Sequence, residues 1–307
     1  MKLDIVMYHY VRPISKSRYP KIKGLELEAF KDQLDFFLKE KKLVTTDDVI
    51  NAVSNSTELP KDAVWLTFDD GYKDHYDYVA PILEKKGINA AFFPVSDTYE
   101  FGHLLDVNKI HYILASVDDV KSLLTHLAAE MEVEGLSRSD FNGWLNSTDK
   151  SSRYDSEEVI FFKRMLQRDL PLELRQKILG RLFENLVGRT EKEVSEELYM
   201  SKSDLVSMSD RGFHIGSHTT SHMWLNSQTI EEQEKEIKNS LYALGSIRND
   251  VSNWIMCYPY GAFNADTLSF LRSMGAAVGL TTEVRQANLS ADDPLTLPRF
   301  DTNDFPH

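Results

Sequence analysis

Short apolar runs alternate with helical patterns along much of the chain. Runs rich in β-branched and aromatic residues predict strands at residues 5–8, 64–68, 90–95, 214–217, 254–258 and 276–280. Between them, apolar residues recur at helical spacing over residues 27–38, 79–86 and 230–244. Strands and helices that alternate in this way are typical of βα units around a parallel sheet. We therefore expect an α/β fold.

The stretch from about residue 98 to residue 206 interrupts this alternation. It contains no convincing strand and shows several helical patterns, for example over residues 117–132, 156–170 and 172–186. A connection of this length without structure of its own is uncommon in a compact domain. We predict that residues 1–97 and 207–307 form the two parts of one α/β body. Residues 98–206 are expected to form a mainly helical insertion that serves as a lid or an interface.

The composition narrows the class of partner. The chain has 35 Lys and Arg against 48 Asp and Glu, a formal net charge of −13. Such a chain repels phosphate backbones and anionic headgroups, so we expect neither a nucleic acid nor a membrane surface as partner. The first residues lack the apolar run of a secretory signal, and no later stretch has the ~20 apolar residues of a transmembrane segment. We expect a cytoplasmic protein, and the sequence does not indicate its oligomeric state.

Two adjacent carboxylates, Asp69 and Asp70, follow the predicted strand at residues 64–68 and precede Gly71. At the carboxyl end of a parallel strand, side chains point into the crevice where α/β proteins bind ligands. A solvated Asp-Gly turn is the plainer alternative, since this dipeptide is common in turns.

Two histidines, His218 and His222, lie four residues apart after a later predicted strand. If they face the same way across one turn, they could bind a tetrahedral metal with a carboxylate and leave positions open for water. A solvated surface pair is the alternative. Because Cys257 is the single cysteine, any metal site must use histidines and carboxylates.

A third stretch, Pro259-Tyr260-Gly261, follows the predicted strand at residues 254–258. In this order, the acidic pair, the histidine pair and the Pro-Tyr-Gly turn together resemble the polysaccharide deacetylase family, also known as the NodB homology or carbohydrate esterase 4 group. The resemblance covers roughly residues 5–96 and 205–280. The opening Met7-Tyr8-His9-Tyr10-Val11 is similar to the first strand of a subset that includes deacetylases of poly-N-acetylglucosamine.

The resemblance implies a distorted (β/α) barrel with its site at the carboxyl ends of the strands. Asp70, His218 and His222 would then hold one divalent metal, commonly zinc. Such an ion polarises an amide carbonyl and lowers the pKa of water toward ~7. Asp69 would be the general base, and Tyr260 would direct its backbone N–H at the developing oxyanion.

Further residues are expected around the same cleft. Tyr72 is expected to offer its ring to a pyranose, beside the turn of Pro259 and Tyr260. An ordinary packing role is the alternative for Tyr72.

The sequence departs from the family pattern at two places. Many members carry an arginine shortly before the Pro-Tyr turn, where this chain has Cys257; Arg299 could replace it, or could be a surface residue of a terminal loop. The late Leu-x-His that usually supplies the general acid is missing, and His307 is the only histidine after Thr281. His9 is the candidate general acid, with a packed histidine as the alternative.

The expected function is metal-dependent hydrolysis of the N-acetyl group of an amino sugar or saccharide, in the biosynthesis of a surface glycan. A deacylase of another small amide is the alternative within enzymes, because the same barrel supports other substrates. A carbohydrate-binding protein without turnover is the alternative outside enzymes, supported only by the missing arginine and the missing late histidine.

Overall fold

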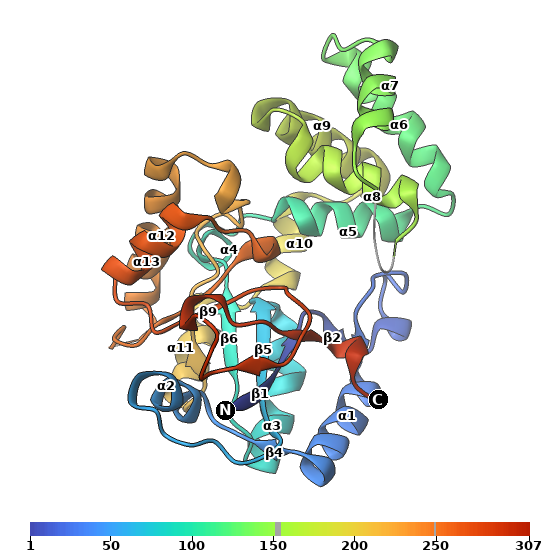
Figure 1. Ribbon diagram of the computed structural model, residues 1–307. Coiled ribbons are helices and arrows are strands. Elements are labelled where there is room, and N and C mark those ends of the chain that lie inside the picture. The colour runs from blue at the N-terminus through green and yellow to red at the C-terminus, as the bar shows by residue number, and fades with distance from the viewer. Residues whose placement is uncertain (151–154, 249) are drawn as a thin grey trace. The chain divides into compact units, whose positions relative to one another are not determined.

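The computed structural model describes residues 1–150, 155–248 and 250–307 (Figure 1). It divides into two compact units. The barrel unit comprises Met1–Pro13, Gly24–Gly102 and Glu197–His307, and the helical unit comprises Ile14–Lys23 and His103–Glu196. These bounds differ from the predicted segments, because residues 98–102 and 197–206 cluster with the barrel and residues 14–23 cluster with the helices.

Parallel strands run around the barrel unit in a closed circuit. In order along the sheet they are β1 (Lys2–Tyr8), β5 (Ala63–Asp70), β6 (Ala91–Pro94) and β7 (His214–Ile215), and a second pair is formed by β8 (Ile255–Cys257) and β9 (Val278–Leu280). A bridge between Ser217 and Met256 joins the two groups. A bridge from Leu280 to Leu297 and the pairing of β11 (Phe300–Asp301) with β1 complete the circuit. Single bridges at two of the joints make this a distorted (β/α) barrel, as expected.

The central strand β5 has all its residues buried, as the continuous apolar run in its sequence predicts for a parallel strand covered on both faces. Because side chains alternate across a strand, its residues contribute to two different cores. Val64, Leu66 and Phe68 pack with apolar residues of the surrounding helices. Ala63 and Trp65 pack with residues of β1, β6, β8 and β9, which only the barrel interior can bring together.

The barrel helices agree with the sequence pattern where that pattern is amphipathic. The helices are α1 (Leu27–Glu40), α2 (Thr46–Asn55), α3 (Ala80–Lys86), α4 (Ser96–Phe101), α11 (Lys202–Asp210), α12 (Ile230–Gly245) and α13 (Ala265–Ser273). Gly87 ends α3 in the left-handed conformation. Short strands β2 (Val11–Arg12), β3 (Leu25–Glu26), β4 (Lys42–Leu43) and β10 (Ala287–Asn288) complete this unit.

The helical unit is formed by α5 (Asp106–Ser116), α6 (Val120–Val133), α7 (Arg138–Ser147), α8 (Glu157–Arg164), a π-helix (Met165–Asp169) and α9 (Leu172–Val187). Helix α10 (Glu191–Leu198) lies at its end. The helix α5 packs against α9, and α6 packs against α8 and α9. The role of the helical unit as a lid or an interface stays a prediction. Among the described residues of both units, no helix combines the length and the apolar character that crossing a bilayer requires.

Candidate active site

The two carboxylates of the acidic pair lie at the carboxyl end of β5. Asp69 has the same parity as Ala63 and Trp65, so its side chain lies on the interior face of the barrel. The chain then turns sharply, because Asp70 has φ +68° and Gly71 has φ +71°. A Cβ at Gly71 would lie 2.7 Å from the Cβ of Pro94, so this position requires glycine.

The two histidines lie on an irregular loop after β7. We expected them to face the same way across one turn. Their side chains do face the same point, but from an irregular loop, because Thr219 and His222 have φ of +64° and +60°, which no regular helix contains. The loop is fixed by its neighbours instead. The backbone N–H groups of Ser96 and Asp97 donate to the carbonyls of Thr219 (3.2 Å) and Thr220 (3.0 Å).

A glutamate on α12 holds the other side of this loop. The Glu236 carboxylate accepts hydrogen bonds from the backbone N–H groups of Thr220 (3.1 Å) and Ser221 (2.9 Å) and from the Ser221 hydroxyl (2.8 Å). Glu236 could not be predicted from the sequence, since nothing in its helical surface pattern distinguishes it from the neighbouring glutamates. The loop geometry thus depends on contacts far apart in the sequence.

Asp70, His218 and His222 converge on one buried point. The Nε2 atoms of His218 and His222 lie 3.3 and 3.4 Å from Oδ1 of Asp70. Oδ2 of Asp70 accepts a hydrogen bond from the Tyr72 hydroxyl (2.6 Å), while Oδ1 is buried without a hydrogen-bond partner. Nδ1 of His218 bonds to the carbonyl of Cys257 (2.7 Å), which leaves its Nε2 lone pair directed at Asp70.

These three donor atoms fit a divalent metal. Two ligand atoms at about 2.0–2.1 Å from a tetrahedral zinc lie about 3.3–3.4 Å apart, which matches both histidine–carboxylate separations. Burial disfavours the ionised form of Asp70, but the adjacent imidazoles of His218 and His222 outweigh this effect and hold the pKa of Asp70 well below its usual range. The group therefore presents a negative charge and an unsatisfied oxygen at the same point.

Asp69 is paired with a buried arginine. Two nitrogens of Arg299 donate to the two oxygens of Asp69, each at 2.8 Å, and Arg299 also donates to the carbonyl of Thr281 (2.9 Å). Burial alone would raise the pKa of Asp69, but the charge and hydrogen bonds of Arg299 lower it to about 2. Arg299 lies between Leu297 and β11, on the segment that closes the barrel, and is only 1% exposed. It is not a surface residue of a terminal loop.

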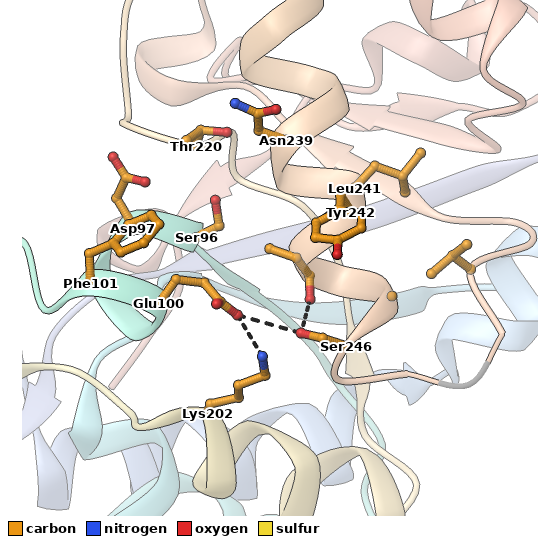
Figure 2. Close-up of a pocket in the computed structure, with 13 residues that line it drawn as sticks. Ser96, Asp97, Glu100, Phe101, Lys202, Thr220, Asn239, Leu241, Tyr242 and Ser246 are labelled. Carbon is orange, nitrogen blue, oxygen red and sulfur yellow. Dashed lines mark hydrogen bonds and ion pairs between the residues drawn. The ribbon is translucent and has the colours of Figure 1, made fainter.

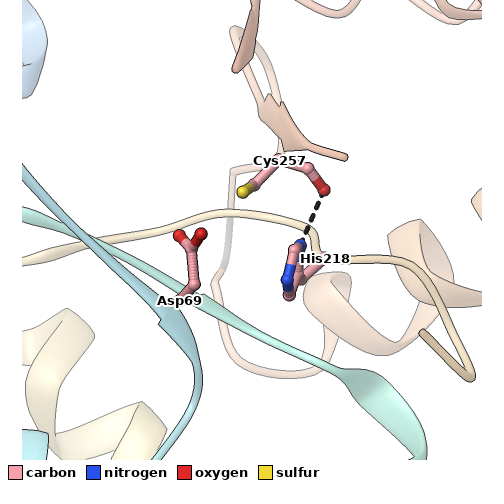
Figure 3. Close-up of side chains that lie close together, drawn as sticks. All are labelled: Asp69, His218 and Cys257. Atoms are coloured by element: carbon pink, nitrogen blue, oxygen red, sulfur yellow. Dashed lines mark hydrogen bonds between the residues drawn. The ribbon is translucent and has the colours of Figure 1, made fainter. Parts of the chain in front are cut away.

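A second group with metal-binding side chains shares His218 and consists of Asp69, His218 and Cys257 (Figure 3). Here Arg299 already supplies a positive charge, because it donates to Cys257 Sγ (3.2 Å) as well as to Asp69. Burial raises the pKa of the Cys257 thiol, which disfavours the thiolate that a metal requires. The Asp70 group is therefore the better cation site.

His9 lies on the solvent side of Asp69. Its Nε2 is 3.9 Å from Oδ2 of Asp69, and its side chain is 42% exposed. Its backbone carbonyl lies 2.8 Å from Nε2 of the fully buried His75, which fixes the chain at this point. His9 is therefore accessible beside the carboxylate, unlike a histidine packed in the core.

The Pro-Tyr-Gly turn places an aromatic ring beside the histidines. Tyr260 has φ +59°, and its ring meets His222 edge to face (4.7 Å) and stacks on Trp224 (4.5 Å). A Cβ at Gly261 would lie 2.3 Å from Oγ1 of Thr282, so the turn is tightly held. Trp224 could not be predicted as part of the site, because it lies just beyond the histidine pair in an irregular stretch of the sequence.

Two residues expected at the substrate have other surroundings. The ring of Tyr72 is fully buried between the rings of Tyr10 (4.2 Å) and Tyr199 (6.2 Å), so neither face is open to a pyranose. Its hydroxyl instead holds Asp70. Pro259 is buried as well, and it shapes the turn without an exposed surface. The expected substrate contacts of Tyr72 and Pro259 are therefore wrong for these side chains.

Comparisons with known proteins agree with this architecture. Residues 56–136 and 182–279 match the polysaccharide deacetylase family. YxkH of Bacillus subtilis (strain 168), named as a polysaccharide deacetylase, is 28% identical over 92 residues, which are 30% of this chain and 33% of that protein. The match thus spans a third of the length of this curated relative.

Solved structures show the same fold over nearly the whole chain. The deacetylase PplD of Streptococcus pyogenes, solved with acetate, has a TM-score of 0.62 at 19% identity and covers 98% of this chain and 92% of its own. A de-N-acetylase from Aggregatibacter actinomycetemcomitans has a TM-score of 0.55 at 15% identity, with coverage of 98% and 96%. The family match extends over more than half of the sequence, and the chain belongs to the polysaccharide deacetylase family.

Proposed function

We propose that this protein is a metal-dependent hydrolase that removes the N-acetyl group from an amino sugar or saccharide, releasing acetate and a free amine. The observation that carries the proposal is the buried, unsatisfied Oδ1 of Asp70, which faces two histidine nitrogens beside the arginine-paired Asp69. The family and the fold support deacetylation of a carbohydrate.

Asp70, His218 and His222 would hold the ion, and zinc fits their two nitrogens and one oxygen. When bound, the ion supplies Lewis-acid polarisation of the amide carbonyl and of water. The protein groups behind the ligands set their orientation: Tyr72 fixes Asp70, and the Cys257 carbonyl fixes the tautomer of His218.

Asp69 is the proposed general base. Its pKa of about 2 keeps it ionised at any physiological pH, and Arg299 fixes the plane of its carboxylate. This bidentate pairing orients the carboxylate in the way that the arginine missing before the Pro-Tyr turn would otherwise provide. Oδ2 of Asp69 lies 3.9 Å from Nε2 of the accessible His9, and we place on this side the water that gives up its proton to the carboxylate.

The leaving amine needs a proton, and His9 is the proposed donor because it is accessible and lies beside Asp69. The backbone N–H of Tyr260 is the proposed donor to the oxyanion. The stacked rings of Tyr260 and Trp224, next to His222, offer an apolar wall for the sugar or its acetyl methyl group. Cytoplasmic residence and a role in surface glycan biosynthesis stay predictions.

Acetate release from N-acetylglucosamine oligomers, measured together with metal content, tests the proposal. Asp69→Asn is expected to keep the metal of the wild-type protein and to lose acetate release by at least about 100-fold, because the ligands are intact and the base is gone. Asp35→Asn, at an exposed carboxylate on α1, is the control and is expected to change neither.

Full metal content without acetate release by the wild-type protein would favour a binding protein. Release from small cyclic amides alone would favour a deacylase of another substrate. The same assay tests His9, since His9→Ala is expected to slow amide substrates more than activated esters; equal slowing of both would exclude the role of proton donor.

A further inference from the structure

A second concave site lies in the barrel unit, between α4 and α12 (Figure 2). Its volume is about 760 Å³, within the range of pockets that bind small ligands. The residues that line it come from α4, from α12 and the stretch just after it, from the start of α11 and from the loop between His218 and His222. No residue of the candidate metal group lines it.

Two aromatic rings at this pocket are unusually exposed. Tyr242 on α12 is 87% exposed and Phe101 on α4 is 70% exposed, the highest values for any aromatic side chain in the part of the chain that the structure describes. Figure 2 shows them on opposite sides of the pocket. Leaving such rings in water costs free energy, so their convergence from two helices indicates a ligand with apolar faces.

The polar groups of the pocket indicate the rest of the ligand. Asn239 adds an amide at the rim, and Asp97 and Glu100 add two carboxylates against the single ammonium of Lys202. Lys202 pairs with Glu100 (2.9 Å) and the Ser246 hydroxyl also bonds to Glu100 (3.5 Å). The charged groups that line the pocket therefore sum to a formal charge of −1, which favours a neutral or cationic ligand.

The pocket is built on the same loop as the candidate metal ligands. Thr220, which lies between His218 and His222, lines the pocket, and its carbonyl accepts a hydrogen bond from the backbone N–H of Asp97 (3.0 Å). The pocket and the catalytic groups are thus fixed to one another within the barrel unit. A long ligand could reach the pocket while another part of it occupies the catalytic site.

We propose that this pocket binds amino-sugar residues of a saccharide chain, and preferentially residues whose amine is already free. A pyranose presents C–H faces that pack on Tyr242 and Phe101, hydroxyls that bond to Asn239, and, after loss of acetyl, an ammonium that the carboxylates attract. This inference rests on the proposed function, since that reaction generates the free amine. The pocket would retain a partly processed chain.

The experiment uses the metal-loaded full chain carrying Asp69→Asn, which cannot turn over the ligand. Affinity for a glucosamine hexamer and for an N-acetylglucosamine hexamer is measured by calorimetry in this background. Adding Tyr242→Ala or Phe101→Ala is expected to weaken binding of the glucosamine hexamer by about tenfold or more. Tyr78→Ala removes an exposed tyrosine that does not line the pocket, and it is expected to change affinity by less than twofold.

A second variant tests the charge. Asp97→Asn is expected to weaken binding of the glucosamine hexamer more than binding of the N-acetylated hexamer. Unchanged affinity in both aromatic variants, or binding of neither hexamer to the parent protein, would overturn the proposal. These outcomes are separate from failure of the proposed function, which is read from acetate release by the wild-type catalytic site.

Discussion

The chemistry of individual residues in the barrel depends on which partner satisfies each buried charge. Asp69 and Asp70 are adjacent, equally buried and both ionised, yet they are held differently. Arg299 satisfies both oxygens of Asp69, whereas Tyr72 satisfies only one oxygen of Asp70. The acidic pair and the histidines were visible in the sequence, because they follow strands. Of their partners, Arg299 was predicted only through the family resemblance and as one of two alternatives, because Arg299 and Asp69 are 230 positions apart. The contact of the Tyr72 hydroxyl with Asp70 was not predicted.

Replacing Arg299 by methionine tests the pairing of Asp69. Breaking a buried ion pair from one side leaves an uncompensated charge, so we expect Arg299→Met to lower the free energy of unfolding by about 3–5 kcal/mol at pH 7. Arg285→Met, at a partly exposed arginine that pairs with Glu283 and Asp292, is the control and is expected to cost about 1 kcal/mol or less. Urea unfolding measures both.

The contribution of Asp69 to stability depends on pH with opposite signs in the wild type and in Arg299→Met. In the wild type the pKa of Asp69 is about 2, below its usual 3.8, so its stabilisation is present above pH 4 and is lost as pH falls toward 2. In Arg299→Met, the lowering by Arg299 is removed, while burial, the largest influence, still raises the pKa of the carboxyl against the weaker effects of His218 and His9, so the loss of stability should shrink at acidic pH. A loss that is the same at pH 5 and pH 7 would contradict this assignment.

Tyr72 provides a test of the metal ligand that does not need substrate. Tyr72→Phe removes the hydroxyl that fixes Asp70 and is expected to weaken zinc binding by about 10–100-fold, as measured by competition with a chromophoric chelator. Tyr8→Phe removes an equally buried hydroxyl, which bonds to Gln33, and should leave zinc affinity unchanged. Equal effects of the two variants would mean that Tyr72 acts through packing alone.

At the scale of elements, turns and irregular joints position the site more than the strands do. The strands at residues 64–68 and 90–95 were predicted almost as observed, because their apolar runs are long. The segment that contains Arg299 was not predicted, because it joins the sheet through one bridge and a two-residue strand, which produce no period in the sequence. The histidine pair faces one carboxylate as expected, but the irregular backbone of its loop was not predicted, since its left-handed residues are not glycines.

Comparing two glycines in the left-handed conformation distinguishes the cost of backbone strain from the cost of a side-chain clash. A Cβ added at Gly71 (φ +71°) would lie 2.7 Å from the Cβ of Pro94, whereas a Cβ added at Gly87 (φ +67°) would have no atom within 4 Å. Gly87→Ala should therefore cost only about 1–2 kcal/mol for its backbone, and Gly71→Ala should cost at least about 3 kcal/mol because a clash is added. Thermal or urea unfolding checks the difference. Equal costs would show that the turn after Asp70 has room to relax.

At the scale of the whole molecule, a barrel of parallel strands brings residues from both ends of the sequence to one place. The carboxyl ends of β5 and β7 supply the acidic pair and the histidines, and the closing segment supplies Arg299. The order of the motifs predicted this convergence through the family resemblance. The limits of the helical unit were predicted less well. Residues 14–23 belong to this unit although they lie far from residues 103–196 in the sequence, and nothing in the sequence pattern indicates this contact.

The central claim is that Asp70, His218 and His222 bind one cation beside Asp69. Anomalous diffraction at the zinc edge from crystals of the zinc-loaded protein tests it most directly. We expect a single strong peak in the barrel, within about 2.0–2.2 Å of Asp70 Oδ1 and of both histidine Nε2 atoms. A peak at Asp69 and Cys257 instead, or no peak among these side chains, would contradict the account.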